Sequence, residues 1–319
     1  MPKIASLARR PAADHLMAAW YRVICTHQFR EPFLPSFPII LCADDYGLSP
    51  AVSAGILEAL SAGRLNATGA MTNQPHWKIA ARDLQALKPS GPQSVQFGVQ
   101  FGVHLNLTMG KPITTAAALA PSGAFPQLST FLRGKLPREG VADVVHEIRA
   151  QLDAFENTMG RAPDFIDGHQ HVHVLEPVRG LLLDEALLRG YAGKVWLRDS
   201  TDKPARIIKR GVETKKALAL AWFGRGFAKD AQARGFEVND GFSGFSAFDS
   251  TRDYGADFAR YLAQPGQRHL VMCHPGHVDD ELKSLDPVTT TREQELAFLL
   301  SDRFSEAMEK AGAKLGLWD

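Results

Sequence analysis

The sequence predicts an α/β fold in which parallel strands alternate with helices around one barrel-sized core. Short apolar runs suited to buried strands recur along the chain, and amphipathic helical patterns separate them. Ionisable residues stand where several of these runs end. Strands that alternate with helices are typical of parallel strands joined by crossover helices. With 319 residues, 45% of them hydrophobic, the chain suits a single barrel-sized domain.

The composition argues against several classes of partner. The formal net charge is +1, so no global field favours nucleic acid or an anionic membrane surface. No apolar run approaches the length of a membrane span, and the N-terminus lacks a secretory signal pattern. The three cysteines, Cys25, Cys42 and Cys273, are too few for a disulfide framework. We therefore expect a cytoplasmic protein that acts on a small or neutral molecule.

Residues 1 to 37 are expected to form an N-terminal extension, and residues 38 to 319 the folded domain. The extension carries early arginines and a short helical run over residues 12 to 24, and Pro32 and Pro35, with Pro38 at the start of the domain, then break regular structure. A targeting arm is one interpretation. A loosely packed extension, or one that helps a subunit contact, is favoured over it, and a homo-oligomer stays open.

The first strand of the domain is predicted over residues 38 to 43, an apolar run that ends at Asp44 and Asp45. A helix follows, with Ser49 as its N-cap and Pro50 as its first residue. The two acids are therefore expected in the loop that joins this strand to its helix.

The next elements repeat the same order. Residues 97 to 107 alternate apolar and polar side chains as a strand does, and they include His104. Residues 111 to 140 are rich in Pro, Gly, Ala and Thr and predict a long surface loop, which in a compact domain is usually a functional lid or a disordered segment. Residues 141 to 159 predict a helix with one apolar face.

A stretch dense in histidine follows over residues 164 to 174, where His169, His171 and His173 come after Asp167. In an extended chain, alternate side chains share one face. Their Cβ atoms would stand about 7 Å apart, twice the rise per residue, whereas ligand nitrogens lie about 2 Å from a metal. One or two of the three would therefore bind a metal. This interpretation is favoured over a polar strand edge.

Residues 181 to 188 predict a helix and residues 194 to 197 a short strand. The basic stretch from 203 to 234 is interpreted as solvated helix faces rather than as an anion site. Residues 242 to 248 form an aromatic, Gly-containing loop. Such a loop either stacks on sugar rings or packs as local core, and the second is favoured.

The last predicted strand, residues 270 to 277, ends in His274 and His277. Cys273 stands next to His274, but neighbouring residues on a strand point to opposite faces, so a thiol nucleophile is rejected. Residues 290 to 293 match a capping box ahead of a closing amphipathic helix.

Four predicted strands thus end in reactive groups, and in a parallel barrel all such ends meet at one rim. A carboxylate with two imidazoles leaves positions open for water and substrate, as a catalytic metal site requires. These donors suit Zn²⁺, and also Mn²⁺, Fe²⁺, Co²⁺ or Ni²⁺, and suit Mg²⁺ less well. The groups are Asp44 and Asp45, His104, the segment from Asp167 to His173, and the segment from His274 to His277.

Five motifs follow one another between about residues 38 and 300: Ala43-Asp-Asp-Tyr-Gly-Leu-Ser-Pro50, Gly102-Val-His-Leu-Asn-Leu-Thr108, Ile166-Asp-Gly-His-Gln-His-Val-His173, Cys273-His-Pro-Gly276 and Arg292-x-x-Glu-Leu296. In this order they resemble the motifs of the YdjC-like carbohydrate deacetylase family, which includes the chitooligosaccharide deacetylases. Tyr46 stands where many members of that family have Phe.

The resemblance implies a distorted β/α barrel related to the polysaccharide deacetylases, with one divalent metal. Carried over by position, the metal ligands are Asp45, His104 and His169. Asp44 matches the general base of the family, and His274 is a candidate proton donor. Zn²⁺ is favoured by ligand type, with Mg²⁺, Mn²⁺, Co²⁺ and Ni²⁺ also open.

The predicted activity is removal of an N-acetyl group from an amino sugar by metal-activated water. His171, His173 and His277 are weaker candidates for the proton donor. Asp167 is expected to orient a ligand imidazole or a backbone amide, or else to cap the strand end. Arg292 either pairs with a site carboxylate or lies on the surface, and the surface position is favoured.

Two other classes of function stay open. A metal hydrolase of phosphoesters would need basic groups at the rim to meet phosphate. A metal-containing sugar-binding protein without turnover would tolerate the loss of Asp44, which is present here. The sequence does not specify which N-acetylated sugar is the substrate.

Overall fold

A computed structural model describes residues 36–87, 98–134, 136 and 138–318 of the chain. The predicted N-terminal extension, with its helical run, lies outside the described residues except for its last two positions. The division into an extension and a domain therefore stays a prediction. In the described part of the chain, none of the helices is both long and apolar enough to cross a membrane.

Among the described residues, eight strands form one sheet in the order β5-β4-β3-β2-β1-β7-β6, with β8 paired to β1. Each pair of neighbouring strands is parallel, so their C-terminal ends all lie at one rim. The strands are β1 (Phe37–Tyr46), β2 (Ala67–Ala70), β3 (Gln100–Leu105), β4 (Phe165–Gly168), β5 (Trp196–Leu197), β6 (Phe242–Ser243), β7 (His269–Cys273) and β8 (Ala313–Leu315).

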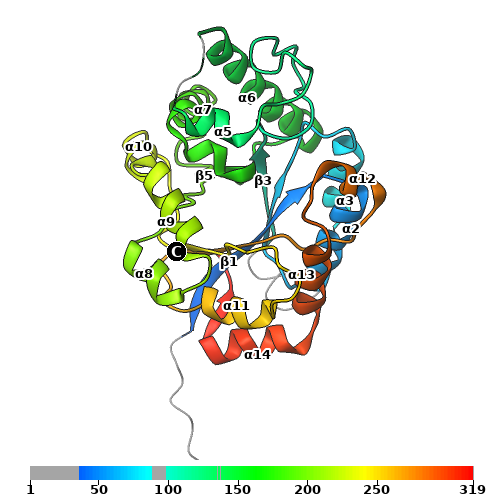
Figure 1. The fold of residues 1–319 in the computed structure, drawn as a ribbon, viewed down its shortest axis with the longest axis vertical. Coiled ribbons are helices and arrows are strands. Elements are labelled where there is room, and N and C mark those ends of the chain that lie inside the picture. Colours follow the sequence, from blue (N-terminus) through cyan, green and yellow to red (C-terminus); the bar gives the residue numbers. More distant parts are fainter. Residues whose placement is uncertain (1–35, 88–97, 135, 137, 319) are drawn as a thin grey trace, which may run out of the picture. The chain divides into compact units, whose positions relative to one another are not determined.

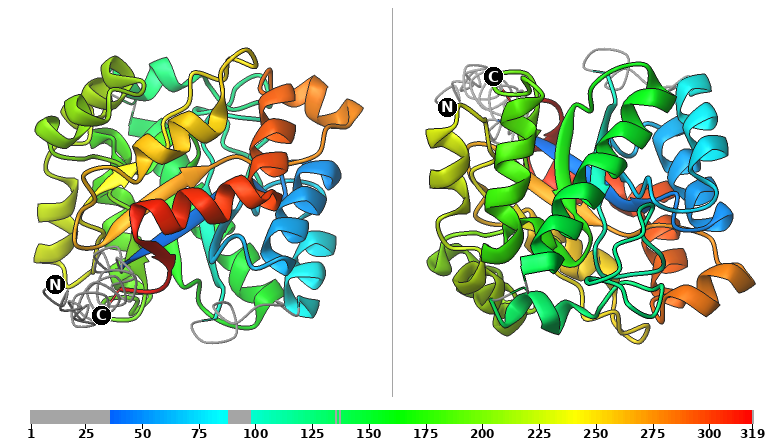
Figure 2. Two further views of the ribbon diagram at one scale, coloured as in Figure 1. Left: turned by 90° about the horizontal axis from the view of Figure 1, so that it is seen from below. Right: turned by 90° about the horizontal axis from the view of Figure 1, so that it is seen from above.

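Helices surround the sheet in Figures 1 and 2. Their apolar faces cover the strands, as crossover helices of parallel strands do. The helices are α2 (Pro50–Ser61), α3 (Trp77–Ala86), α5 (Leu128–Leu132), α6 (Arg138–Met159), the 3₁₀ turn η1 (His169–Val174), α7 (Glu176–Leu188), α8 (Pro204–Arg210), α9 (Thr214–Phe223), α10 (Phe227–Ala233), α11 (Tyr254–Tyr261), α12 (Asp280–Leu285), α13 (Thr290–Leu300) and α14 (Asp302–Ala311).

The two ends of the sheet approach each other. Leu197 in β5 forms a single parallel bridge with Val238, a few residues before β6. The Leu197 amide also donates to the Glu237 carbonyl at 2.9 Å. The sheet therefore curls into a distorted β/α barrel, and the predicted fold class is confirmed.

The start of the domain follows the sequence prediction closely. The Ser49 hydroxyl caps α2 by accepting from the Val52 amide at 3.2 Å, and Pro50 is the first helical residue. The first strand differs from its prediction at its C-terminal end. β1 continues through Asp44 and Asp45 to Tyr46, so the two acids lie in the strand and not in the loop after it.

The predicted histidine strand is wrong beyond Gly168. β4 ends there, and His169 begins a 3₁₀ turn in which Gln170 and His171 have φ values of 51° and 58°. The turn brings the His173 ring back over Gly168, where an added Cβ would lie 2.9 Å from His173 Nδ1. The three histidines therefore do not share one face of a strand. The backbone conformation of the turn sets the direction of each side chain.

The closing helix also differs from its prediction. The predicted capping box needs Thr290 as the N-cap, but Thr290 is the first residue of α13. Thr289 precedes the helix and makes no side-chain cap, so the predicted capping box is wrong. The helical run is divided at Ser301 into α13 and α14. The sequence patterns also missed β2, α3 and β8, and the predicted long loop of residues 111 to 140 contains the short helix α5.

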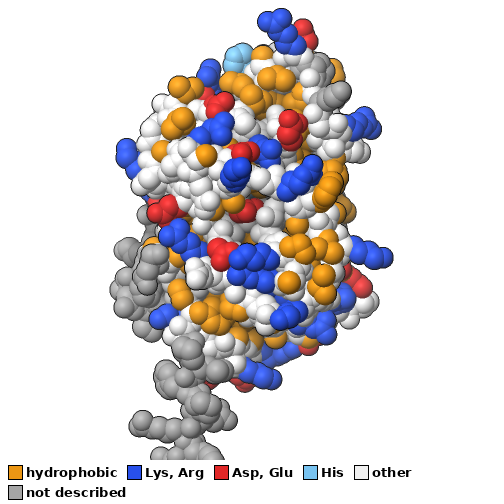
Figure 3. Space-filling model, turned by 90° about the vertical axis from the view of Figure 1, so that its left-hand side faces the viewer, with side chains coloured by type: hydrophobic (Ala, Val, Ile, Leu, Met, Phe, Trp, Pro, Cys, Tyr) orange, Lys and Arg blue, Asp and Glu red, His pale blue; other side chains and the backbone are white. Residues whose placement is uncertain are grey.

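The surface has no simple charge pattern on the face that Figure 3 shows, which is the side of α8, α9 and α10 in Figure 1. Lys and Arg side chains are spread among acidic ones and among separate groups of hydrophobic side chains. This mixture agrees with the near-balanced formal charge of the chain.

One close approach inside the sheet gives a test of the fold. A Cβ added at Gly102 in β3 would lie 2.5 Å from the buried Phe165 ring in β4. We expect Gly102→Ala to lower the free energy of unfolding by about 1–3 kcal/mol, because the overpacked ring must move. Urea denaturation measures this loss.

The matched control is Gly180→Ala in α7, where an added Cβ meets nothing within 4 Å. This variant should be as stable as the parent or more stable by up to about 1 kcal/mol, because Ala favours the helix. Equal urea midpoints for Gly102→Ala and Gly180→Ala would contradict the described packing of β3 against β4.

Candidate metal centre

A pocket of about 440 Å³ lies at the rim where the parallel strands end. It brings together side chains that are far apart in the sequence, as a parallel barrel allows. Many of its remaining lining residues are apolar. The ionisable residues that line it are Asp44, Asp45, His104, His169, His171, Lys216, His274, Asp286 and Arg292.

The two adjacent acids both reach this pocket because β1 is irregular at its end. In a regular strand, neighbouring side chains point to opposite faces. Asp45 has a φ of 69°, and the register between β1 and β2 shifts between Ala43 and Tyr46. Such a bulge re-aims side chains. Asp44 and Asp45 therefore both line the pocket but contact different partners.

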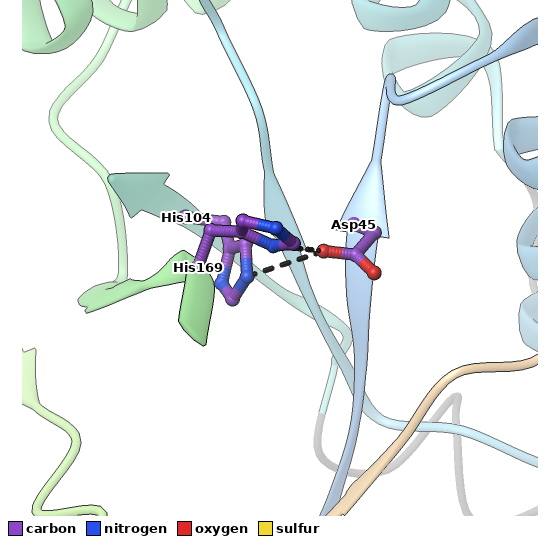
Figure 4. A group of neighbouring side chains, drawn as sticks. All are labelled: Asp45, His104 and His169. Carbon is purple, nitrogen blue, oxygen red and sulfur yellow. Dashed lines mark hydrogen bonds and ion pairs between the residues drawn. The ribbon is translucent and has the colours of Figure 1, made fainter. Parts of the chain in front are cut away.

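Asp45, His104 and His169 form a compact, buried group of metal-type donors (Figure 4). Asp45 Oδ1 lies 2.9 Å from His169 Nδ1 and 3.3 Å from His104 Nε2. One potential ligand atom from each of the three residues lies within 4.8 Å of the others. The family resemblance implied these three residues as ligands, and the structure brings them together.

Asp167 orients the His104 ring through the ring nitrogen that faces away from Asp45. His104 Nδ1 lies 2.7 Å from Asp167 Oδ1, which leaves Nε2 facing Asp45. Histidines that ligate metals almost always donate their other ring N–H to a carboxylate, a backbone carbonyl or a water molecule. Gly69 makes room for the pair, because an added Cβ would lie 3.1 Å from Asp167 Oδ1 and 3.2 Å from the His104 Cβ.

The charge environment favours the protonated form of His104. Burial by itself lowers the pKa of His104, but the charges of Asp167 and Asp44 outweigh it and raise the pKa to about 10. A metal ligand must be deprotonated at the nitrogen that binds. A divalent ion and a proton would therefore compete for His104 Nε2.

Arg198 is a site residue that the sequence analysis missed. Its guanidinium, fully buried, donates to Asp44 Oδ2 at 2.7 Å and to Asp44 Oδ1 at 2.6 Å, and it pairs with Asp167 Oδ2 at 2.5 Å. It also contacts Cys42 Sγ at 3.0 Å. Cys42, Asp44 and Asp167 are a second cluster of metal-type donors, but the guanidinium already neutralises it. Arg198 directly follows β5, and this place at a strand end was the available signal.

Arg292 pairs with the other acid of β1. Only 1% of Arg292 is exposed, and its guanidinium donates to Asp45 Oδ2 at 2.7 Å and to Asp286 Oδ2 at 2.8 Å. The favoured prediction of a surface arginine is wrong. Burial alone raises the pKa of Asp45, but the Arg292 charge and the two histidines hold it well below its usual range.

His274 follows β7 and lines the pocket. Its backbone amide donates to Glu295 Oε2 at 2.6 Å, and its ring lies edge-on to Phe248. Burial lowers the pKa of His274 to about 4, although Asp45 and Asp44 raise it in part. The imidazole is therefore neutral near pH 7. Burial raises the pKa of Glu295, which belongs to the fifth motif but received no role from the sequence, to about 7.

The structure separates the other predicted histidines. His171 lines the pocket and lies edge-on to Phe242 and Phe245. His173 is buried away from the pocket, and its Nε2–H donates to the Arg198 carbonyl at 2.8 Å. His277 is half exposed and pairs with Glu58 at 3.0 Å.

Two segments with unassigned roles also reach the pocket. Phe245 and Phe248 of the aromatic loop line it, whereas Phe242 packs in the core. Lys216 of the basic stretch lines it as well, and its Nζ donates to the Ser246 carbonyl at 2.8 Å.

The chain is similar to known proteins over most of its length. Residues 38–310 match the model of a family described as YdjC-like protein. A human carbohydrate deacetylase is 30% identical over 270 residues, covering 76% of each chain. A chitooligosaccharide deacetylase of Klebsiella pneumoniae (strain 342) is 29% identical over 286 residues, covering 88% of this chain and 97% of that one.

A solved structure has a similar fold. It is a candidate cellobiose-phosphate cleavage protein from Enterococcus faecalis V583, with a TM-score of 0.66 and 26% sequence identity. The match covers 88% of this chain and 97% of that chain. The barrel described above is therefore shared over nearly the whole length of that protein.

The contact between Asp167 and His104 predicts a measurable effect on metal binding. We expect Asp167→Asn to weaken the affinity for Zn²⁺ by about 10–100-fold, because the ring loses its orienting carboxylate. Competition with a chromophoric chelator measures the dissociation constant. Asp184→Asn, an exposed acid on α7, is the control and should leave the affinity unchanged. An unchanged affinity for Asp167→Asn would show that Asp167 does not support a metal ligand.

Metal binding should also depend on pH. His104 has a raised pKa, so its imidazole is protonated at pH 7 in the metal-free protein, and binding must release that proton. The apparent affinity for Zn²⁺ should therefore rise with pH up to about the pKa of His104. Calorimetry in buffers of different ionisation enthalpy counts the protons released. Release of no proton at pH 7 would show that binding does not displace a proton from His104 and would contradict its raised pKa.

Proposed function

This chain belongs to the YdjC-like protein family, and from that membership we propose that it is a metal-dependent N-deacetylase acting on an amino sugar. The names of its relatives, a carbohydrate deacetylase and a chitooligosaccharide deacetylase, support this reaction class. The observation that carries the proposal is the meeting of Asp45, His104 and His169 beside Asp44 in one pocket.

The donor set fits a divalent ion. His169 Nε2 and His274 Nδ1 are buried and lack a hydrogen-bond partner among the described residues, so polar atoms in this pocket are left for a ligand or water. Asp45, His104 and His169 would hold the ion, and two imidazoles favour Zn²⁺ over Mg²⁺, with Mn²⁺, Co²⁺ and Ni²⁺ as alternatives. When bound, such an ion polarises a carbonyl and lowers the pKa of water from 15.7 towards about 7.

Asp44 is the proposed general base. Arg198 contacts both of its carboxylate oxygens, which fixes the orientation of the carboxylate at the pocket wall. Each carboxylate oxygen has two lone pairs, so the bonds to Arg198 leave acceptor capacity for a water molecule. Asp44 would take a proton from that water as it attacks the acetyl carbonyl.

His274 is the proposed donor of the proton to the leaving amine. Because its imidazole is neutral near pH 7, it must receive a proton during the reaction before it can donate one as an imidazolium. Asp44 holds the proton taken from water and lines the same pocket, so it is the proposed source. His171 is the remaining histidine of the pocket outside the ligand group and the weaker candidate.

The rival functions have less support. A phosphoester hydrolase needs cations free to meet phosphate. Of the Lys and Arg residues that line the described pocket, Arg292 is paired with two carboxylates and Lys216 donates to a backbone carbonyl.

The cytoplasmic location and the homo-oligomer stay predictions.

Acetate release tests the reaction class. Metal-stripped protein, resupplied with Zn²⁺, Mn²⁺, Co²⁺, Ni²⁺ or Mg²⁺, should release acetate from at least one N-acetylated sugar in a panel. His104→Ala should abolish the metal-dependent rate, because it removes a ligand. Release of phosphate from sugar phosphates in place of acetate would favour the phosphoesterase.

Asp44→Asn tests whether the protein is a catalyst or a sugar-binding protein. We expect kcat to fall by about 10²–10⁴, the usual contribution of a general base, while bound metal and sugar affinity are retained. Metal analysis and circular dichroism check that the variant folds and keeps its ion. Unchanged turnover in Asp44→Asn would remove Asp44 from the mechanism.

A further inference from the structure

One part of the pocket wall is apolar, away from the acids and histidines. Leu128 and Leu132 of α5 line one part of it, and Leu220 and Phe223 of α9 line another. Phe248 adds an aromatic ring. Sugar hydroxyls buried against such side chains lose their hydrogen bonds to water without replacement, which is unfavourable. The acetamido end of a substrate meets polar groups here, but its other end meets hydrocarbon.

The apolar surface continues out of the pocket. A second pocket of about 280 Å³ shares Leu132 and Phe223 with the first and extends to Leu175 and Trp222. Trp222 is 64% exposed, Phe223 40% and Leu132 37%. Exposed apolar side chains that adjoin one another mark a binding surface more often than scattered ones do. We name this surface, formed by these four residues with Leu128 and Leu220, the α5–α9 groove.

The composition of α9 supports the same conclusion. From Ala217 to its end, this helix consists of Ala, Leu, Trp and Phe residues. Leu218, Leu220 and Ala221 are half-buried and pack against the core, whereas Ala219, Trp222 and Phe223 are exposed. A helix that is apolar on all sides is normally buried. The last turn of α9 therefore exposes apolar side chains that such a helix would usually bury.

The cations of the groove lie at its edges. The Arg225 guanidinium stacks over the Trp222 ring at 4.2 Å, and Arg179 donates to the Arg225 carbonyl at 2.8 Å. Lys216 of α9 also lines the first pocket, but its Nζ donates to the Ser246 carbonyl at 2.8 Å. The side chains that α5 and α9 present between Leu128 and Phe223 are apolar, so an occupant is apolar where it touches them.

We propose that the substrate is an N-acetylated amino sugar that carries an apolar aglycone, such as an alkyl or isoprenoid chain, and that this aglycone binds in the α5–α9 groove. The inference rests on the proposed deacetylase function, because it takes the N-acetyl group of the sugar as the group that reacts. The continuity of the groove with the pocket that contains the metal ligands supports it. The sugar is held at the polar rim, and the chain lies along α9.

A series of alkyl N-acetyl-β-glucosaminides tests the proposal, with methyl, butyl and octyl chains below their micelle concentrations. Burial of each methylene is worth about two- to fourfold in affinity, so KM should fall steeply from methyl to octyl while kcat changes little. N,N′-diacetylchitobiose is the substrate without an aglycone. The octyl glycoside should have a much lower KM than this disaccharide.

Variants of groove residues test where the alkyl chain binds. Phe223→Ser and Leu132→Ser should each reduce the advantage of the octyl over the methyl glycoside by about tenfold, since a large apolar contact is lost. Leu188→Ser is the control, because Leu188 is 76% exposed on α7 and lines neither pocket. It should keep the full dependence on chain length.

The outcomes separate the two proposals. Acetate release with a KM that does not depend on chain length would overturn the aglycone and leave the deacetylase standing. No acetate from any glycoside or from the disaccharide, with metal bound, would refute both. If Phe223→Ser instead dissociated an oligomer in light scattering and kept the chain-length dependence, the groove would be a subunit contact and the aglycone proposal would be wrong.

Discussion

Two adjacent buried carboxylates, each neutralised by its own buried arginine, are the constraint on which this site depends. Asp44 pairs with Arg198 and Asp45 with Arg292. Removing one partner from a buried ion pair costs about 3–5 kcal/mol, because a charge is left uncompensated. Neighbouring acids at the end of a buried strand are therefore stable only if cations reach both of them. The left-handed conformation at Asp45 turns the two side chains towards these separate partners.

The two ion pairs belong to one network that divides the roles of the acids. Asp167 contacts Arg198 through one oxygen and His104 through the other. Asp45 gives one oxygen to Arg292 and turns the other towards the histidines, so it is available as a metal ligand. Asp44 is oriented by Arg198 at the edge of the same pocket. One acid is thus placed to bind an ion, and its neighbour is placed to act on water beside it.

The sequence was sufficient for the barrel, because strand and helix periodicities are local properties, and the motif resemblance pointed to the acids and histidines that line its rim. It was not sufficient for residues whose positions depend on contacts with distant parts of the chain. Arg198 follows a strand of two residues, too short for a periodic pattern, and its burial depends on Asp44, 154 positions earlier. Arg292 resembles an ordinary helix-start residue until Asp45 is placed beside it. The histidine stretch alternates as a strand does, but the chain must turn into α7 directly after it, and the backbone at His171 is left-handed.

The central claim is that Asp45, His104 and His169 bind one metal while Arg198 occupies the neighbouring cluster of donors. Anomalous diffraction from crystals grown with Zn²⁺, recorded above and below the absorption edge, tests it most directly. The account predicts a single peak among those three side chains. A peak in the cluster around Arg198, or full binding of Zn²⁺ elsewhere with none at the triad, would contradict it.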